Sequence, residues 1–397
     1  MFEALTPRPN DPIMAIMELC KADKNPNKID LGPGVYKDDT GQTTILKAVK
    51  LAEEYWNREE PTKSYVGTVG NQDFCRLMLD LVLGADHPAI TEGRIGAAQS
   101  TGGSGALRLG AELLHEALPG SVVWASTPTW ANHIPLISDT GMKMDSYPYY
   151  NRETLGVDFE DMLAHLDKNA KRGDIVLLHG CCHNPTGADL SHEQWDRLAV
   201  FLSEKGLYPY IDLAYFGLGR GMEDDTYGTR KVIEYCPEVL LALSCSKNFA
   251  LYRERTGLIA AITKTPDAAK IARSQFGAIQ RKLVSMPPDH GAALVVRILE
   301  DEKLREMWVS ELDDMRERMR GLRMQLSEAL NVQGGEAMSA AIKDQNGMFS
   351  TLPLTKEQAQ KLRIDHGVYL LDSGRINIAG ANSNNIPRLA EAILAVL

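Results

Sequence analysis

Five short, mostly apolar runs constrain the fold of this chain more than any other feature of its sequence. Each run is too short for a buried helix and suits a strand that is covered on both faces of a sheet. Stretches with helical spacing separate most of these runs, which predicts an α/β fold with a mostly parallel sheet covered by helices. The runs cover residues 122–125, 174–178, 207–211, 239–243 and 258–262, and the helical stretches cover residues 159–166, 192–204 and 228–235.

The two ends of the chain carry patterns of their own. Residues 302–330 have the charged, periodic pattern of a long surface helix, and the tail after them predicts a smaller α+β domain ending in a helix. Pro7, Pro9 and Pro12 predict an irregular arm at the start, because proline disrupts regular structure. We expect an arm over residues 1–12, a large domain over 44–310, and a small domain formed by 13–43 and 311–397. Further expected elements are helices over 13–21 and 44–59, and strands over 28–31, 347–352, 368–371 and 375–379.

Charge and cysteine usage exclude several classes of protein. The chain has 43 Lys and Arg against 53 Asp and Glu, a net charge of −10, which argues against nucleic acid or an anionic membrane as a partner. It has no apolar run of 18 residues, and residues 1–11 lack the apolar core of a signal peptide. The six cysteines include an adjacent pair, which is unlike a disulfide scaffold. We therefore expect a cytoplasmic protein without a membrane-spanning helix.

Polar residues follow the expected strands at their carboxyl ends, where α/β sheets bind their ligands. Lys247 comes after the run 239–243 and has no acidic residue within six positions. A half-buried lysine of this kind has a lowered pKa, which suits a Schiff-base amine; an ordinary solvated loop lysine is the alternative. Asp212 follows the run 207–211, where it could hold a cationic heterocycle or merely cap a helix.

Two further segments suggest ligands. Thr101-Gly-Gly-Ser-Gly opens a helical stretch and is either a phosphate cradle or a plain turn. His179, Cys181, Cys182 and His183 include the residue types of a metal site. Vicinal cysteines fit poorly at one tetrahedral centre, however, and the usual C-x₂-C spacing is missing. We expect no metal.

The segment Ser244-Cys-Ser-Lys247-Asn-Phe-Ala-Leu-Tyr-Arg-Glu-Arg255 resembles the cofactor-lysine segment of the class I aminotransferases, which use pyridoxal 5′-phosphate. The similarity is greatest to the branch that acts on aspartate and aromatic amino acids. The matches run in order from residue 28 to residue 380, and this ordered set is specific although each motif is short. The other matching segments are Gly32-Pro-Gly34-Val-Tyr-Lys, Ser64-Tyr65, Pro128-Thr-Trp130-Ala-Asn-His133, His179-Gly-Cys-Cys-His-Asn184-Pro-Thr-Gly and Gly374-Arg375-Ile-Asn-Ile-Ala-Gly380.

The resemblance implies a role for each matching residue around the cofactor. Lys247 would carry the cofactor as a Schiff base and move the substrate proton, and Asp212 would pair with the pyridine nitrogen. His133 and His179 would support Asp212. Further cofactor contacts would come from Tyr215 and Asn184 at the 3′-oxygen, Trp130 on the ring, Gly103, Ser104, Ser244, Ser246 and Arg255 at the phosphate, and Tyr65 of a neighbouring subunit at that phosphate.

The resemblance also implies how substrate is held. Arg375 would clamp the α-carboxylate with Gly34 beside it, and Trp130 and Asn184 would line the same space. Arg281 would bind the distal carboxylate of a dicarboxylic substrate from across a dimer. These roles imply a homodimer with shared active sites, whose partners are amino acids and 2-oxo acids.

Several positions depart from the family pattern, and together they match neither the aspartate type nor the aromatic type alone. Phe216 replaces a common Gln, Ala131 a common Pro, and Met286 the Asn that is typical of aspartate enzymes. Ser104 matches the members that prefer aromatic substrates. Val35, Lys37 and Thr43, in contrast, match the aspartate type. We therefore expect transamination of both aspartate and aromatic amino acids with 2-oxoglutarate.

Four alternatives stay open at this point. The chain could be an aspartate-only aminotransferase, or a β-eliminating lyase of the same fold that shares Lys247 and Asp212 and does not need Arg281. It could also be a non-catalytic regulator that binds pyridoxal phosphate, although such proteins usually carry a fused DNA-binding module. A dinucleotide dehydrogenase would have a similar sheet, but the G-x-G-x-x-G fingerprint is absent.

Overall fold

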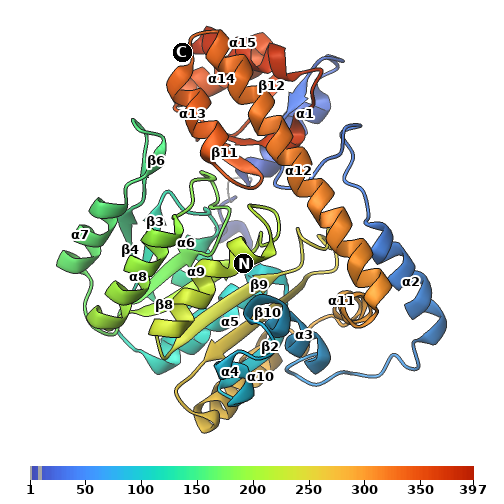
Figure 1. Cartoon of the computed structure of the whole chain (residues 1–397), viewed down its shortest axis with the longest axis vertical. Helices are drawn as coiled ribbons and strands as arrows, with labels where there is room; N and C mark the ends of the chain where they lie inside the picture. Colours follow the sequence, from blue (N-terminus) through green and yellow to red (C-terminus); the bar gives the residue numbers. More distant parts are fainter. Residues whose placement is uncertain (1, 8–10) are drawn as a thin grey trace.

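A seven-stranded sheet in the order β2-β10-β9-β8-β7-β3-β4 forms the centre of the molecule (Figure 1). In this computed structural model, which describes residues 2–7 and 11–397, only β10 runs against its neighbours, and all other paired strands of the sheet are parallel. The predicted α/β class with a mostly parallel sheet is confirmed. The strands are β2 (Ile95–Thr101), β3 (Val122–Thr127), β4 (Lys143–Pro148), β7 (Ile175–His179), β8 (Tyr208–Leu213), β9 (Val239–Ser244) and β10 (Thr256–Ile262).

Helices cover both faces of this sheet and enclose two separate apolar cores. One face carries α5, α6 and α10. Leu107 of α5 and Phe276 of α10 are among the buried residues of this core. The other face carries α3, α7, α8, α9 and α11, with Met78 and Leu198 among its buried residues. These helices are α3 (Gln72–Leu83), α5 (Gly102–Ala117), α6 (His133–Ser138), α7 (Phe159–Asn169), α8 (His192–Lys205), α9 (Met222–Tyr235), α10 (Pro266–Leu283) and α11 (His290–Glu300).

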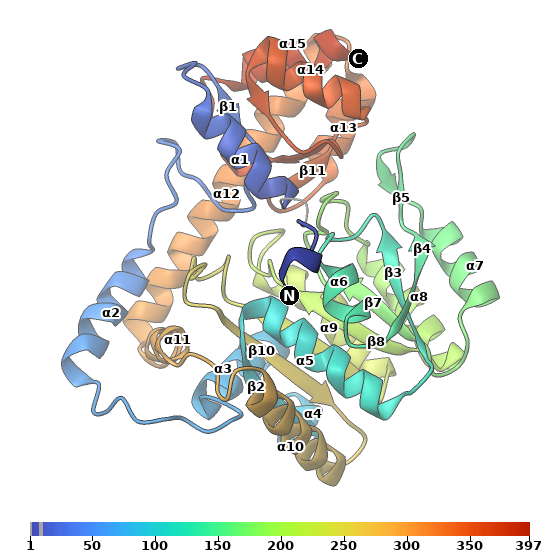
Figure 2. The ribbon, with the colours of Figure 1, turned by 180° about the vertical axis from the view of Figure 1, so that it is seen from behind.

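The two chain ends come together in a smaller α+β domain, as the sequence predicts (Figures 1 and 2). Strand β1 (Ile29–Asp30) pairs in parallel with β12 (Val368–Tyr369), so the segment before residue 44 packs against the tail. Strands β11 (Phe349–Thr351) and β13 (Arg375–Asn377) pair antiparallel. The other elements of this domain are α1 (Pro12–Ala22), α13 (Glu336–Asp344), α14 (Lys356–His366), the 3-10 helix η2 (Ile378–Gly380) and α15 (Ile386–Val396).

The long helix α12 (Glu302–Val332) runs from the large domain into the small one (Figure 1). The predicted boundary between residues 310 and 311 falls inside this helix and stays a prediction. Helix α2 (Lys47–Glu59) packs beside α11 and α12. The remaining elements are the short helices η1 (Phe2–Ala4) and α4 (Pro88–Thr91), and the hairpin of β5 (Tyr150–Asn151) and β6 (Gly156–Val157).

The start of the chain differs in one respect from the sequence prediction. Pro12 was expected to prevent a regular start, but it is the first residue of α1. Proline is compatible with this position, because the backbone N–H of the first helical residue has no hydrogen-bond acceptor inside the helix and proline has no N–H. The side chain of Asp11 caps the helix by accepting hydrogen bonds from the amides of Ile13 and Met14 at 2.9 and 3.1 Å. Positions 1 and 8–10, which include Pro9, lie outside the described residues.

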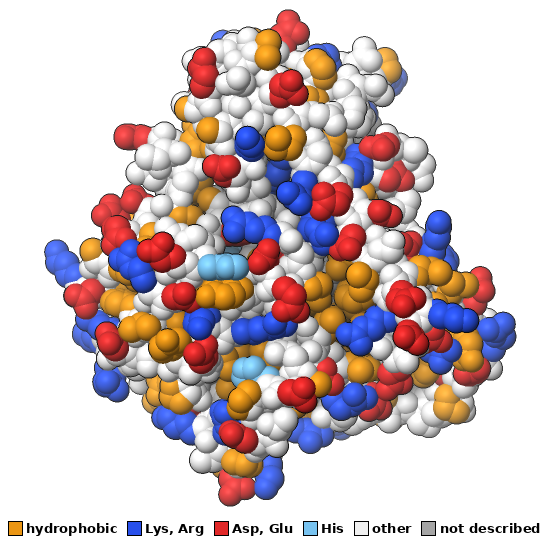
Figure 3. All heavy atoms as spheres, viewed as in Figure 1, with side chains coloured by type: hydrophobic (Ala, Val, Ile, Leu, Met, Phe, Trp, Pro, Cys, Tyr) orange, Lys and Arg blue, Asp and Glu red, His pale blue; other side chains and the backbone are white. Residues whose placement is uncertain are grey.

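The surface carries charged side chains of both signs. On the face drawn in Figure 3, acidic and basic side chains are intermixed over both domains. Among the described residues, no helix has the length and apolar character that crossing a membrane requires.

Candidate active site

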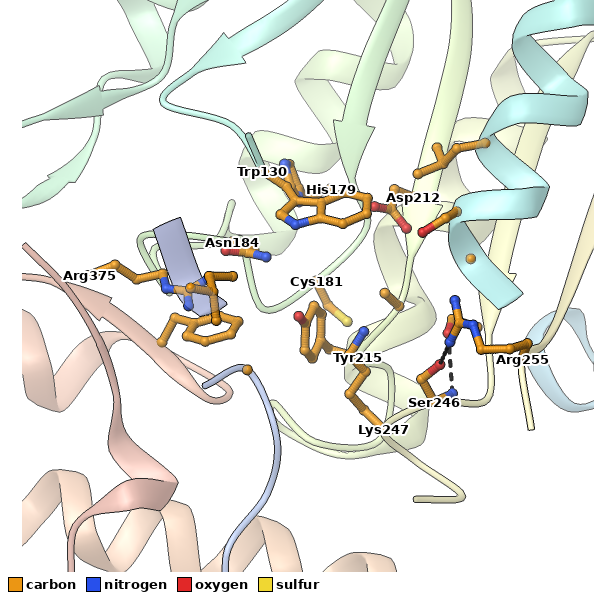
Figure 4. Close-up of a pocket in the computed structure, with 18 residues that line it drawn as sticks. Trp130, His179, Cys181, Asn184, Asp212, Tyr215, Ser246, Lys247, Arg255 and Arg375 are labelled. Atoms are coloured by element: carbon orange, nitrogen blue, oxygen red, sulfur yellow. Dashed lines mark hydrogen bonds between the residues drawn. The ribbon is translucent and has the colours of Figure 1, made fainter. Parts of the chain in front are cut away.

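All but two of the predicted site residues line one cavity of about 270 Å³ at the carboxyl ends of β7, β8 and β9. Figure 4 shows Arg255 and Arg375 at opposite ends of this cavity, with Lys247 and Tyr215 between them. The predicted residues in its lining are Gly34, Gly103, Ser104, Trp130, Asn184, Asp212, Tyr215, Ser244, Ser246, Lys247, Arg255 and Arg375. Sequence reasoning missed Ile13, Leu107, Cys181, Ala214 and Phe349, which complete the lining together with His179.

The end of the cavity at Arg255 is built for an anion. Helix α5 begins at Gly102, so its unpaired amides and its dipole face this space. Arg255 adopts a left-handed backbone conformation with φ of 51°, and its Nη1 donates to the Ser246 hydroxyl at 3.3 Å. A Cβ at Gly102 would lie 2.6 Å from Nη2 of Arg255, so only glycine lets the guanidinium come this close. The combination fits a phosphate dianion.

Lys247 lies in the middle of the cavity, with Nζ 4.9 Å from the centre of the Tyr215 ring. Among the described residues, no carboxylate lies within 4.0 Å of this amine. Burial is the main effect that lowers the pKa of Lys247; Asp212 opposes it and Arg255 adds to it, and the resulting pKa is about 8. The predicted lowering of this pKa is confirmed. A larger share of the amine is therefore neutral near pH 7 than in an ordinary lysine, as Schiff-base formation requires.

Asp212 stands at the end of β8 with a histidine behind it. Its Oδ2 lies 3.0 Å from Nε2 of His133, and His133 is fully buried. Burial on its own would raise the pKa of Asp212. The hydrogen bond from His133 and the positive charges nearby outweigh that effect and hold the pKa below its ordinary value. Asp212 is therefore an ionised carboxylate, the group that a protonated heterocycle needs.

Thr129 connects His133 to His179, and sequence reasoning missed this connection. Its hydroxyl lies 2.8 Å from Nδ1 of His133 and 3.1 Å from Nε2 of His179. Burial, with the repulsion of His133, lowers the pKa of His179 to about 3, although Asp212 acts in the opposite direction. His179 is thus a neutral ring that lies opposite Asp212 on the neighbouring strand and is linked to His133 through Thr129.

The end of the cavity at Arg375 is suited to a carboxylate. Arg375 is only 4% exposed, and its guanidinium stacks 4.5 Å from the centre of the Phe349 ring. Nη2 donates to the carbonyl of Gly32 at 2.7 Å, while Nε has no hydrogen-bond partner among the described residues. A buried guanidinium with open donors of this kind calls for an anionic ligand.

The loop from His179 to Asp189 carries Asn184 into the cavity. The carboxylate of Asp189 accepts the amides of Cys182 and His183 at 2.9 and 2.8 Å, which fixes the turn, and Cys182 has a φ of 50°. The thiols of Cys181 and Cys182 and a carboxylate oxygen of Asp225 lie within 4.8 Å of one another. The Asp225 carboxylate already accepts three backbone amides, those of Gly217, Gly219 and Arg220. The absence of a metal stays a prediction.

Two predicted residues lie away from the cavity. Tyr65 is 92% exposed. Arg281 is in the last turn of α10 and borders a separate surface hollow with Thr68 and Gly277. One copy of the chain therefore does not bring either residue to Lys247.

Comparison with known proteins agrees with this site. Residues 26–393 match the family of class I and II aminotransferases. The chain is 43% identical to the aspartate aminotransferase of Salmonella typhi over 397 residues, the full length of both. It is 44% identical to the aromatic-amino-acid aminotransferase of Pseudomonas aeruginosa over 388 residues, which cover 98% of this chain and 97% of the relative.

Solved structures of the same family have the same fold. An aromatic amino acid aminotransferase with 3-indolebutyric acid superposes with a TM-score of 0.96 at 43% identity, covering 100% of both chains. The aromatic-amino-acid aminotransferase of Burkholderia pseudomallei, covalently bound to pyridoxal phosphate, gives 0.97 at 39% identity, covering 100% of this chain and 99% of that one. This chain belongs to the family of class I and II aminotransferases and is a pyridoxal-phosphate-dependent transaminase.

Proposed function

We propose that this enzyme transfers amino groups between 2-oxoglutarate and two kinds of donor, aspartate and the aromatic amino acids. The observation that carries the proposal is Arg375, a buried guanidinium with open donors at the far end of the cavity from Arg255. Every amino acid and 2-oxo acid has a carboxylate beside its reacting carbon. Arg375 would pair with this carboxylate and so direct the reacting carbon toward Lys247.

The residues around Lys247 divide the work on the cofactor and the substrate. Bound pyridoxal phosphate supplies the electron sink for the charge that develops at the substrate carbon. Lys247 Nζ takes and returns the proton of that carbon, for which its pKa of about 8 is well matched. Asp212 would keep the pyridine nitrogen of the cofactor protonated, Trp130 would cover its ring, and Tyr215 and Asn184 would donate to its 3′-oxygen.

Five of the lining residues would hold the phosphate group. We assign Gly103, Ser104, Ser244, Ser246 and Arg255 to this cradle, which the start of α5 and the fork of Arg255 support. The substrate lies between Gly34 and Trp130. No metal takes part in this scheme.

The active enzyme in this proposal is a homodimer with shared sites. Tyr65 and Arg281 are exposed in one chain and do not line its cavity. From a second copy, Tyr65 would reach the phosphate and Arg281 the distal carboxylate of aspartate or 2-oxoglutarate. We also assign the enzyme to the cytoplasm, because its cysteines, all six of them free and buried, fit a reducing compartment.

A panel of amino donors tests the proposal. Aspartate, glutamate, tyrosine, phenylalanine and leucine are each offered with an oxo acid, 2-oxoglutarate for every donor except glutamate. We expect turnover with aspartate and with at least one aromatic donor. Turnover with aspartate and no aromatic donor would leave an aspartate-only aminotransferase. Release of pyruvate, without any oxo-acid acceptor, from an amino acid with a leaving group on its β-carbon such as cysteine would instead indicate a β-eliminating lyase.

A further inference from the structure

The hydroxyl of Tyr210 lies directly beneath helix α5, the helix whose start faces the Arg255 end of the cavity. It donates to the carbonyl of Leu107 at 2.7 Å and lies 3.3 Å from the carbonyl of Ala106. Tyr210 is fully buried in the same apolar core as Leu107. These two carbonyls belong to the first two turns of α5, close behind Gly103 and Ser104.

Tyr210 and Asp212 belong to the same strand and face the same side of the sheet. Side chains alternate along a strand, so residues two positions apart share a face. Ile211 and Leu213 accordingly pack into the core on the opposite face, while Tyr210 packs into the core under α5. Strand β8 therefore carries both Asp212 and the contact that supports α5.

Helix α5 has a glycine where the tyrosine approaches it. A Cβ at Gly110 would lie 2.2 Å from the hydroxyl oxygen of Tyr210 and 2.6 Å from its Cζ. Any other residue at position 110 would push the ring or the helix away. Glycine is a poor residue for the middle of a helix, so this close approach is made against local helix propensity.

We infer that Tyr210 is a positioning residue for the cofactor, which sets the distance between the phosphate cradle on α5 and Asp212 on β8. The inference rests on the proposed cradle of Gly103, Ser104 and Arg255. Pyridoxal phosphate has a rigid ring that contains its nitrogen, and its phosphate is attached to this ring through a single methylene group, so the two anchors must be correctly spaced. Strand β8 carries Asp212 and is hydrogen-bonded through Tyr210 to α5, the helix that carries the phosphate cradle. This link fixes the distance between the two anchors.

Tyr210 keeps its proton at every pH at which the enzyme works. Burial raises its pKa well above the ordinary value, and the charge of Asp212 adds to this effect. The hydroxyl is thus a permanent donor to α5. Tyr210→Phe removes only this hydrogen bond and leaves the ring packed in the core.

Tyr147 provides a matched control. It is also buried, and its hydroxyl donates to the carbonyl of Leu177 at 2.9 Å, in the middle of β7. Tyr147→Phe removes a comparable hydrogen bond, but this bond joins β4 to β7 and has no partner atom in α5 or β8. Any loss caused merely by weaker packing of the domain is therefore common to both variants.

The experiment measures how tightly the enzyme freed of cofactor binds pyridoxal 5′-phosphate and pyridoxal, which lacks the phosphate. We expect Tyr210→Phe to weaken binding of the phosphate ester about fivefold, the scale of one buried hydrogen bond, and to leave pyridoxal binding unchanged. Tyr147→Phe changes neither. The inference is wrong if the two variants behave alike, or if Tyr210→Phe weakens both ligands equally.

Arg255→Gln separates this inference from the proposed cradle. That variant removes the guanidinium at the phosphate end, so it must weaken pyridoxal phosphate selectively if the cradle is correct. An unchanged affinity in Arg255→Gln overturns the cradle itself. A selective loss in Arg255→Gln without one in Tyr210→Phe overturns only the role of Tyr210.

Discussion

His133 donates from Nε2 to Oδ2 of Asp212 across 3.0 Å, and both residues are buried. An ionised carboxylate can only accept, so this nitrogen carries the proton. The other ring nitrogen of His133 is free to accept from Thr129, which lies 2.8 Å away and also contacts His179 at 3.1 Å. One chain of hydrogen bonds therefore joins Asp212 to His179.

His179 makes the folded enzyme sensitive to mild acid. Its folded pKa is about 3, whereas a histidine in an unfolded chain titrates near 6.5. Between these values the unfolded chain binds a proton that the folded chain does not, so stability falls as pH falls through this window. One such group contributes a slope of at most about 1.4 kcal/mol per pH unit.

We predict that His179→Asn flattens the decline in stability between pH 7 and pH 5, although the variant starts from a lower stability at pH 7. Urea denaturation midpoints at several pH values measure this slope. His192→Asn is the control, because His192 has a side chain that is 47% exposed and lies on the surface. Equal slopes in the His179 variant and the parent would contradict the assignment.

Lys247 is the second residue whose replacement has a clear expected result. Lys247→Ala keeps the phosphate and ring contacts of the cavity but removes the amine that moves the substrate proton. We predict that the variant still binds pyridoxal phosphate, without a covalent bond, and loses transamination at least about 1000-fold. Absorbance spectra and turnover with aspartate measure the two effects.

Lys264→Ala is the matched control for that variant, because Lys264 lies on the surface and pairs with Glu238 at 2.7 Å. It should keep parental turnover. Near-normal turnover in Lys247→Ala would show that this lysine is not catalytic.

The sequence predicts the central strands well because they are buried on both faces. Strands β3, β7, β8, β9 and β10 each begin and end within two residues of the apolar runs that predict them. The expectation missed β2, in which buried Gln99 and Ser100 interrupt the apolar pattern. Gln99 donates to the carbonyl of Pro288 at 2.7 Å, a long-range contact that no local pattern reveals. The sequence-based expectation also missed β4, an edge strand whose Lys143 is exposed.

The site was predictable where it depends on strand ends and on the family motifs, and not where it depends on packing. Asp212 and Lys247 follow apolar runs directly, so their meeting at one sheet edge follows from topology. Thr129 carries no such signal, because its importance comes from two histidines that fold against it. Phe349 reaches the cavity from the small domain, which strand-end reasoning does not include.

Shared active sites give a prediction about mixed subunits. If Arg281 acts in the neighbouring site, a hybrid of Lys247→Ala and Arg281→Ala subunits has one site with both residues intact. At equal mixing half of the dimers are hybrids, so aspartate turnover should recover to about a quarter of the parental value. Persistent inactivity of the mixture, with subunit exchange shown by mass spectrometry, would mean that each site belongs to one chain.

In the proposed dimer, Arg281 decides the choice of substrate. The half-reaction with 2-oxoglutarate would need it whatever the amino donor is. Aspartate brings a distal carboxylate in its own half-reaction as well, and an aromatic donor does not. A guanidinium left buried without a partner is strongly unfavourable, so Arg281 has to swing out or bond water when an aromatic ring enters.

We predict that Arg281→Ala lowers kcat/KM for aspartate at least about 100-fold, the scale of losing a charged partner, and affects phenylalanine much less. Single-turnover kinetics of each amino donor, without an oxo acid, isolate this half-reaction. Lys282→Ala is the control, since the neighbouring side chain is a cation with 66% exposure. An equal loss for both donors would show that Arg281 supports the structure of α10 and does not select the substrate.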